Sequence, residues 1–335
     1  MNVIAVGAAC VAGLFVAGLV TAFALVATPE PPIAAPADIF DFTSMRKAPT
    51  EIDPPSLRRY KARDGEELAY RIYESTSERI LIFIHGSSYH GGGYHALAAA
   101  LSLGGVAKVV LPNMRGHYQS GPRRGDVDYI GQYEDDLADL IKFLRAEHLT
   151  GPITLGGHSS GGGLAIRFAG GAYAGDVSSY LLMAPIIPLS PAVRGGTAGG
   201  WANLHWKRLY GLIALNAIGI HGFNGLPIVQ FNKPAKYWDG TETLSYSYRL
   251  NASYHPRRNY AADIRALPDR TLVLVGANDQ AIDPDALRAL FAADAPHAQM
   301  TILPGVSHFG IFSEPASLDA AAGWMRGLPD GASPR

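Results

Sequence analysis

The chain has 335 residues, of which 48% are hydrophobic and 17% charged, and its formal net charge is −1 at pH 7. This composition supplies a folded core and excludes a disordered chain, and the single cysteine excludes a disulfide scaffold. The near-neutral charge, without a stripe of Lys and Arg among aromatic residues, argues against nucleic acid as a partner.

The first segment of the chain is almost wholly apolar. No charged residue occurs between Val3 and Ala27, and a helix of this length would reach about 37 Å, enough to cross a hydrocarbon core of about 30 Å. We therefore predict that residues 1–27 form a single-pass transmembrane anchor, so that the protein is located at a membrane. A signal peptide is the alternative, although the basic residues typical of one are absent. Arg46 and Lys47 follow the segment and favour a cytoplasmic main domain, but two residues leave the side of the membrane open.

A linker and then an alternation of strands and helices follow. Residues 28–56 are predicted to be the linker, because they begin with a stretch rich in Pro and Ala. Further along the chain, short apolar runs alternate with segments whose apolar residues have helical spacing. This alternation is typical of a mostly parallel sheet flanked by helices. A hairpin is expected at 63–75, strands at 79–86, 106–113, 152–158, 179–185, 270–279 and 300–305, and helices at 128–147, 161–174, 283–293 and 314–327. The sequence thus predicts an α/β fold whose core comprises residues 57–185 and 260–330.

Residues 186–259 interrupt this alternation. They hold three of the four Trp residues and many Tyr and Phe residues. We interpret the segment as a cap, or lid, inserted between two strands and lying over the carboxyl edge of the sheet. The alternative is that its rings pack only a small core of their own.

A possible nucleophile lies at residues 157–161, GHSSG. The G-x-S-x-G pattern alone is weak evidence, and a flexible surface turn is the alternative. Here, however, the motif follows an apolar strand and precedes a helix of small residues, which is the setting of a nucleophile elbow. Gly157 and Gly161 would leave room for a strained turn that exposes the hydroxyl of Ser159.

A serine needs a base to take its proton, and the base needs an acid to orient it. His308 follows the last expected strand, and Asp279 follows the strand before it, so both lie at carboxyl ends. The order Ser159, Asp279, His308 is the expected one. Asp283 is the rival acid, although it is better placed to cap the helix that Pro284 begins.

Acyl transfer also needs donors for a developing oxyanion. The backbone N–H groups of Ser87 and Ser160 are the candidates, since Ser87 lies in a Gly-rich loop after a strand and Ser160 follows the nucleophile. A metal site is conceivable at three regularly spaced histidines, His85, His90 and His95, but no cysteine or adjacent carboxylate accompanies them. We therefore expect no metal and no cofactor.

Together these motifs resemble those of the α/β-hydrolase superfamily: HGSS at 85–88, GHSSG at 157–161, GANDQAID at 276–283 and GVSH at 305–308. NMRGHYQSG at 113–121 is similar to a further loop of that superfamily, with Asn113 in place of Asp and Tyr118 in place of Gly. The resemblance extends over residues 57–327. Within the superfamily the chain looks most like the lysophospholipase and monoacylglycerol lipase group. This resemblance implies an α/β-hydrolase fold with a cap after the sixth strand.

The functional hypothesis is a membrane-anchored serine hydrolase that cleaves carboxylic esters through an acyl-enzyme, with lysophospholipids or monoacylglycerols as candidate substrates. Cleavage of amides or peptides by the same residues is one alternative. A non-catalytic member that binds a ligand through its cap is another. The sequence leaves open the substrate, its acyl-chain length and the oligomeric state.

Overall fold

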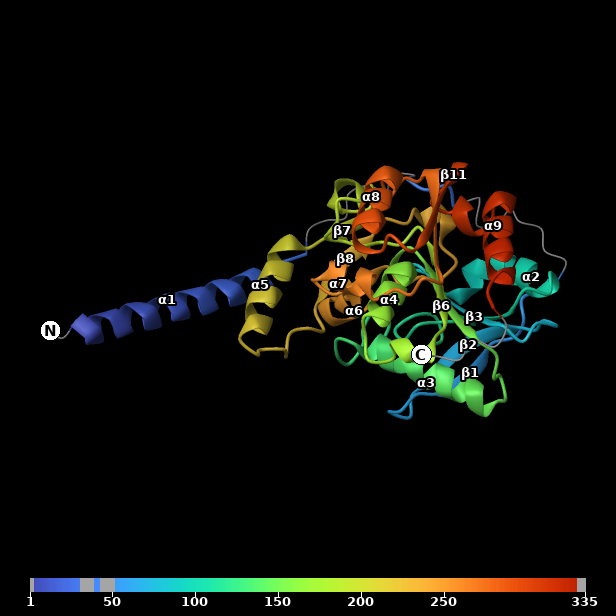
Figure 1. Ribbon diagram of the computed structural model, residues 1–335. Coiled ribbons are helices and arrows are strands. Elements are labelled where there is room, and N and C mark those ends of the chain that lie inside the picture. The colour runs from blue at the N-terminus through green and yellow to red at the C-terminus, as the bar shows by residue number, and fades with distance from the viewer. Residues whose placement is uncertain (1–2, 31–38, 43–51, 330–335) are drawn as a thin grey trace.

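A computed structural model describes residues 3–30, 39–42 and 52–329 of the chain. Within them an eight-stranded sheet forms the centre, in the order β1-β2-β4-β3-β5-β6-β10-β11 (Figure 1). The strands are β1 (Arg58–Lys61), β2 (Glu67–Tyr73), β3 (Ile80–Ile84), β4 (Lys108–Pro112), β5 (Ile153–His158), β6 (Ser179–Met183), β10 (Thr271–Asn278) and β11 (Gln299–Ser307). β2 pairs antiparallel with β1 and β4, and the other pairs are parallel. The predicted mostly parallel sheet is confirmed.

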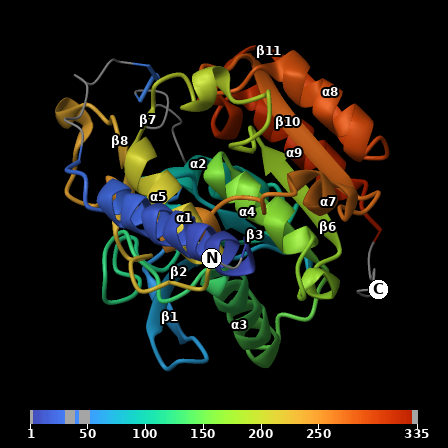
Figure 2. The same cartoon turned by 90° about the vertical axis from the view of Figure 1, so that its left-hand side faces the viewer.

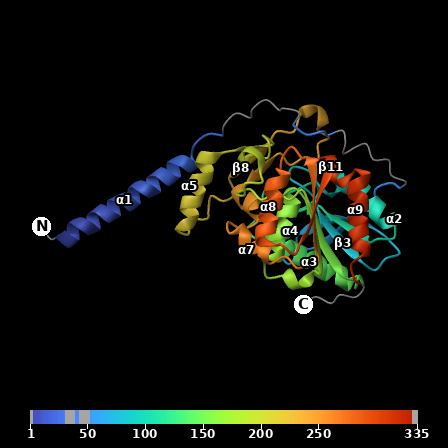
Figure 3. The same cartoon turned by 45° about the horizontal axis from the view of Figure 1, so that its top comes forward.

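Helices cover both faces of this sheet. Figure 3 shows α2 and α9 on one side, and α4, α7 and α8 on the other. The helices are α2 (His95–Leu103), α3 (Gln132–Ala146), α4 (Ser160–Ala169), α7 (Tyr260–Arg265), α8 (Pro284–Asp294) and α9 (Pro315–Arg326). Because both faces are covered, the central strands are continuous apolar runs: every residue of β3 is buried.

The segment 186–259, which we call the cap, contains a second, smaller sheet, and it also packs on the core: Trp201, Phe231 and Tyr246 belong to the same buried cluster as the central strands. A three-stranded antiparallel sheet comprises β7 (Ala202–Leu204), β8 (Pro227–Phe231) and β9 (Ser245–Ser247). Two helices, α5 (Trp206–Ala217) and α6 (Tyr248–Ser253), flank it. The cap thus contributes elements that join none of the core strands.

The N-terminal helix α1 (Val3–Val26) extends away from the core and lies against α5 (Figures 1 and 2). Its C-terminal part is packed on protein: Ala22 and Val26 are buried beside Leu212 and Leu215 of α5. Among the residues that the structure describes, no helix is long and apolar enough to cross a membrane. This finding contradicts the predicted transmembrane anchor and membrane localisation, which rested on the run of uncharged residues alone. Part of that apolar run is covered by α5 instead.

Candidate active site

Ser159 lies in a tight turn between β5 and α4. Its backbone has φ +55° and ψ −121°, an uncommon conformation for a residue with a side chain. A Cβ on Gly157 would lie 2.4 Å from the backbone of Gly161, and one on Gly161 would lie 2.3 Å from the carbonyl oxygen of Ile84. Only glycine fits at both positions. The GHSSG segment is therefore a rigid, strained turn and not a flexible surface loop.

The structure brings the three predicted side chains together. The Ser159 hydroxyl oxygen lies 3.1 Å from Nε2 of His308, and Nδ1 of His308 lies 2.8 Å from Oδ2 of Asp279. All three residues are buried. The side chains come from the ends of β5, β10 and β11, so the parallel sheet delivers them to one edge.

Asp279 is held in one orientation by its second oxygen. Oδ1 accepts hydrogen bonds from the backbone N–H groups of Ala281 and Ile282, both at 2.8 Å. Oδ2 is then left to accept the Nδ1 proton of His308. With the proton on Nδ1, the Nε2 lone pair faces the hydroxyl of Ser159, which is the tautomer that a general base requires.

Asp283, the rival acid, has a different role in the structure. Its Oδ1 accepts from the backbone N–H groups of Asp285 and Ala286, at 3.1 and 3.0 Å, so it caps α8. The carboxylate also lies 3.5 Å from a guanidinium nitrogen of Arg194, and its side chain is 41% exposed. In the described part of the chain, the ring nitrogens of His308 are hydrogen-bonded to Asp279 and Ser159, not to Asp283.

The two predicted oxyanion residues line the same cavity as Ser159 and His308. Ser160 is the first residue of α4, where backbone N–H groups point out of the helix. The Ser87 hydroxyl accepts a hydrogen bond of 3.1 Å from the indole nitrogen of Trp201 in the cap. The amide of the next residue, Ser88, donates to the Tyr246 hydroxyl at 2.7 Å. The cap thus fixes the loop that carries Ser87.

A buried series of hydrogen bonds connects this loop to His308. The Tyr94 hydroxyl accepts from the Gly86 N–H at 2.8 Å and donates to Nδ1 of His158 at 2.9 Å. Nε2 of His158 donates to the carbonyl oxygen of His308 at 2.9 Å. Burial, and then the nearby His308, lower the pKa of His158 well below its ordinary value, so its ring stays neutral. Sequence reasoning did not assign this role to Tyr94 or His158.

We expect Tyr94→Phe to lower kcat about tenfold and to change KM less than about twofold. The variant leaves the buried Gly86 amide without its acceptor, which costs about 1–3 kcal/mol, and it releases the loop next to Ser87. The control is Tyr180→Phe in β6, because the buried Tyr180 hydroxyl has no hydrogen-bond partner in the described part of the chain. Steady-state kinetics on both variants test this. Equal losses of kcat in the two variants would show that the hydrogen bonds made by Tyr94 have no special importance for turnover.

The other histidines in this region bind protein groups. Nε2 of His85 accepts from the Met114 N–H at 3.0 Å, and Nδ1 of His95 lies 2.8 Å from the Tyr73 hydroxyl. Nδ1 of His90 accepts from the Gly92 N–H at 3.1 Å. Among the described residues, no three His, Cys, Asp or Glu side chains are grouped as a metal would require.

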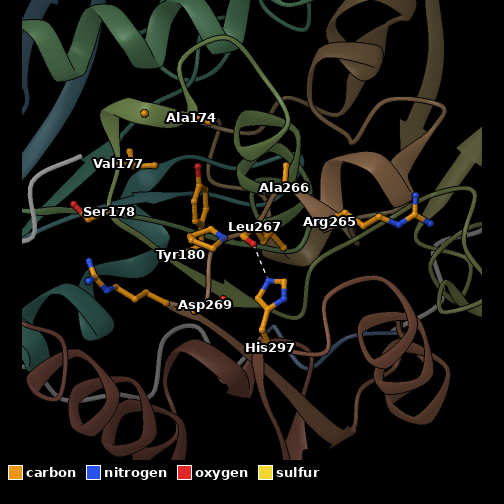
Figure 4. Close-up of a pocket in the computed structure, with 12 residues that line it drawn as sticks. Ala174, Val177, Ser178, Tyr180, Arg265, Ala266, Leu267, Asp269 and His297 are labelled. Atoms are coloured by element: carbon orange, nitrogen blue, oxygen red, sulfur yellow. Dashed lines mark hydrogen bonds between the residues drawn. The ribbon is translucent and has the colours of Figure 1, made fainter. Parts of the chain in front are cut away.

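The cavity at Ser159 has a volume of about 80 Å³. A larger hollow of about 520 Å³ lies elsewhere, beside Tyr180 and His297, where His297 bonds to the Leu267 carbonyl oxygen (Figure 4). Tyr180 is near the start of β6 and Arg270 precedes β10, so this hollow is at the amino ends of the strands. Ligands of open α/β sheets bind at the carboxyl ends. The candidate site is therefore the smaller cavity.

Three comparisons with known proteins show what this chain is similar to. The family described as "Serine aminopeptidase, S33" matches residues 75–219. A monoacylglycerol lipase from Mycolicibacterium smegmatis is 24% identical over 78% of this chain and 93% of its own, and a non-heme chloroperoxidase from Kitasatospora aureofaciens is 26% identical over 73% and 90%. The solved structure of a soluble monoglyceride lipase variant from Saccharomyces cerevisiae has a TM-score of 0.61 and 18% identity, covering 83% of this chain and 97% of that one.

Proposed function

Since the chain belongs to the α/β-hydrolase superfamily and is similar to monoacylglycerol lipases, we propose that this hydrolase cleaves neutral carboxylic esters with Ser159 as nucleophile. The observation that carries the proposal is the pair of contacts made by His308, 3.1 Å to the Ser159 hydroxyl and 2.8 Å to Asp279. A buried carboxylate, an imidazole and a hydroxyl in this order form the arrangement that activates a serine.

In the proposed reaction, the Ser159 oxygen attacks the ester carbonyl carbon while Nε2 of His308 takes the hydroxyl proton. Asp279 stabilises the imidazolium that results. The N–H groups of Ser87 and Ser160 bind the oxyanion. The tetrahedral intermediate then expels the alcohol, which receives the proton from His308, and leaves an acyl-Ser159. Water, deprotonated by His308, releases the acid and restores the hydroxyl.

The cavity lining supports a neutral substrate. Its described residues include no Asp, Glu, Lys or Arg; most are apolar, among them Phe40, Ile186, Val193, Trp201, Val229 and Phe231. A free amine, as an aminopeptidase would bind, needs a carboxylate partner, and a phosphodiester headgroup needs a cation. The site offers neither beside Ser159. A neutral ester with a short acyl chain, such as a short-chain monoacylglycerol, fits this lining better than a lysophospholipid or a peptide.

The test compares three substrate classes on the purified protein: short-chain monoacylglycerols, lysophosphatidylcholine of the same acyl-chain length and amino-acid p-nitroanilides. We expect kcat/KM for the neutral ester to exceed the other two by at least about tenfold, because an unpaired buried charge costs more than the 1.4 kcal/mol that this ratio represents. Faster cleavage of the anilide would overturn the ester proposal in favour of an amidase. No turnover together with no labelling by a fluorophosphonate would favour a non-catalytic binding protein.

A further inference from the structure

A short N-terminal segment, residues 39–42, lies directly over the candidate active site. This segment belongs to the predicted linker, residues 28–56. In the structure Phe40 is only 4% exposed, and its ring stacks on the His308 imidazole with a centroid distance of 5.1 Å and an interplanar angle of 22°. Phe40 also lines the cavity that holds Ser159. A residue nearly 120 positions before the nucleophile in the chain therefore forms part of the cavity wall.

Aromatic contacts hold this segment on two sides. On the cap side, the ring centroids of Phe40 and Trp201 are 5.4 Å apart, and those of Phe42 and Tyr237 are 4.9 Å apart. On the base side, Phe309 lies 4.8 Å from Phe40 and 5.2 Å from Phe42. Edge-to-face and tilted pairs at these distances are favourable beyond the area they bury.

The two phenylalanines differ in one respect. Phe40 stacks on the His308 ring and lines the cavity, whereas Phe42, which is 5% exposed, does not line that cavity and borders a separate hollow beside Tyr237. The two rings thus bury similar apolar surface in the same segment. Phe40 can contact a substrate, and Phe42 can only support the segment.

The cavity that remains is small for a lipid. Its volume is about 80 Å³, whereas pockets that bury a drug-sized ligand measure about 300–1,000 Å³. A short acyl group fits beside Ser159, but a chain of eight or more carbons needs space that aromatic rings now fill. Of the rings in the lining, that of Phe40 is the one that stacks on the base.

We propose that Phe40 determines the acyl-chain length that the site accepts, by closing the cavity at the His308 imidazole. This inference rests on the proposed ester hydrolysis by Ser159. It assigns a substrate-contacting role to a residue from outside both the core and the cap. The whole protein then prefers short acyl chains, and removal of the Phe40 ring opens the site to longer ones.

The experiment measures kcat/KM for p-nitrophenyl acetate, butyrate, octanoate and laurate with wild type, Phe40→Ala, Phe40→Trp and Phe42→Ala. The readout is the ratio of octanoate to acetate, because a general loss of activity from a looser His308 cancels in it. We expect Phe40→Ala to raise this ratio at least tenfold. Phe40→Trp should lower the ratio of butyrate to acetate about threefold or more, since the larger indole narrows the cavity further. Phe42→Ala should keep the wild-type ratios.

Two results would overturn the inference while leaving the proposed function intact. In one, the wild type hydrolyses esters and both Phe40 variants keep its ratios. In the other, Phe42→Ala shifts the ratio as much as Phe40→Ala, so that movement of the whole segment, not the Phe40 ring, sets the preference. If the wild type neither hydrolyses any ester nor reacts with a fluorophosphonate, the proposed function fails, and the role of Phe40 fails with it. Melting temperatures of all four proteins, measured alongside, show which of them are folded.

Discussion

Ser159→Ala is expected to lower kcat for ester hydrolysis by about 10⁴-fold or more. The variant removes the oxygen that forms the acyl-enzyme in the proposed reaction, and neither His308 nor Asp279 can replace it. In serine hydrolases, losses of this size follow removal of the nucleophile, and the activity that remains comes from the oxyanion donors and substrate binding. Labelling by a fluorophosphonate, followed on a gel, should disappear as well.

The matched control for this variant is Ser102→Ala. Ser102 is a buried serine in α2 whose hydroxyl donates to the Ala99 carbonyl oxygen at 3.2 Å, and it does not line the cavity. The control should keep wild-type turnover and labelling. Continued labelling of the Ser159→Ala protein would mean that another residue is the nucleophile.

Asp279→Asn is expected to lower kcat about 10³- to 10⁴-fold with a small change in KM. The two backbone N–H groups of Ala281 and Ile282 demand an acceptor, so the Asn carbonyl oxygen would take the place of Oδ1. The Asn NH₂ group would then point at Nδ1 of His308. That nitrogen would have to accept, and the ring proton would move to Nε2, facing Ser159 in the tautomer that cannot act as a base.

Asp283→Asn separates this effect from a general loss of carboxylate charge. Because Asp283 caps α8, and Asn is also a good cap, the variant should keep nearly full activity and lose less than about 1 kcal/mol of stability. Steady-state kinetics and thermal melts on the two variants decide between the carboxylates. A larger loss of kcat in Asp283→Asn would make Asp283 the acid that orients His308.

Much of the sheet was predictable because it follows from local patterns. Strands with both faces buried are apolar runs, so β3, β4, β5 and β6 are visible in the sequence within a residue or two of their observed bounds. The turn at Ser159 was predictable for a similar reason. Glycines at 157 and 161 are needed by backbone contacts within the turn and with the strand beside it.

Other elements depend on contacts between distant parts of the chain. α2 (His95–Leu103) was not predicted, because its sequence HALAAALSL is mostly small and apolar and lacks an amphipathic pattern. The packing of Phe40 on His308 joins residues far apart in the chain, and no local pattern around either residue indicates it. The prediction of a membrane anchor was wrong for a related reason. The hydropathy of a segment reflects only its own residues, so it does not reveal that α5 covers some of the apolar residues of α1.

The position of residues 39–42 has a practical consequence for work on this protein. A shortened protein that starts at residue 57 would keep every strand of the sheet, the cap, and Ser159, Asp279 and His308. It would lack the ring that now shields one face of the His308 imidazole. Water would then reach His308 more easily, so kinetic results from such a truncated protein would differ from those of the 335-residue chain.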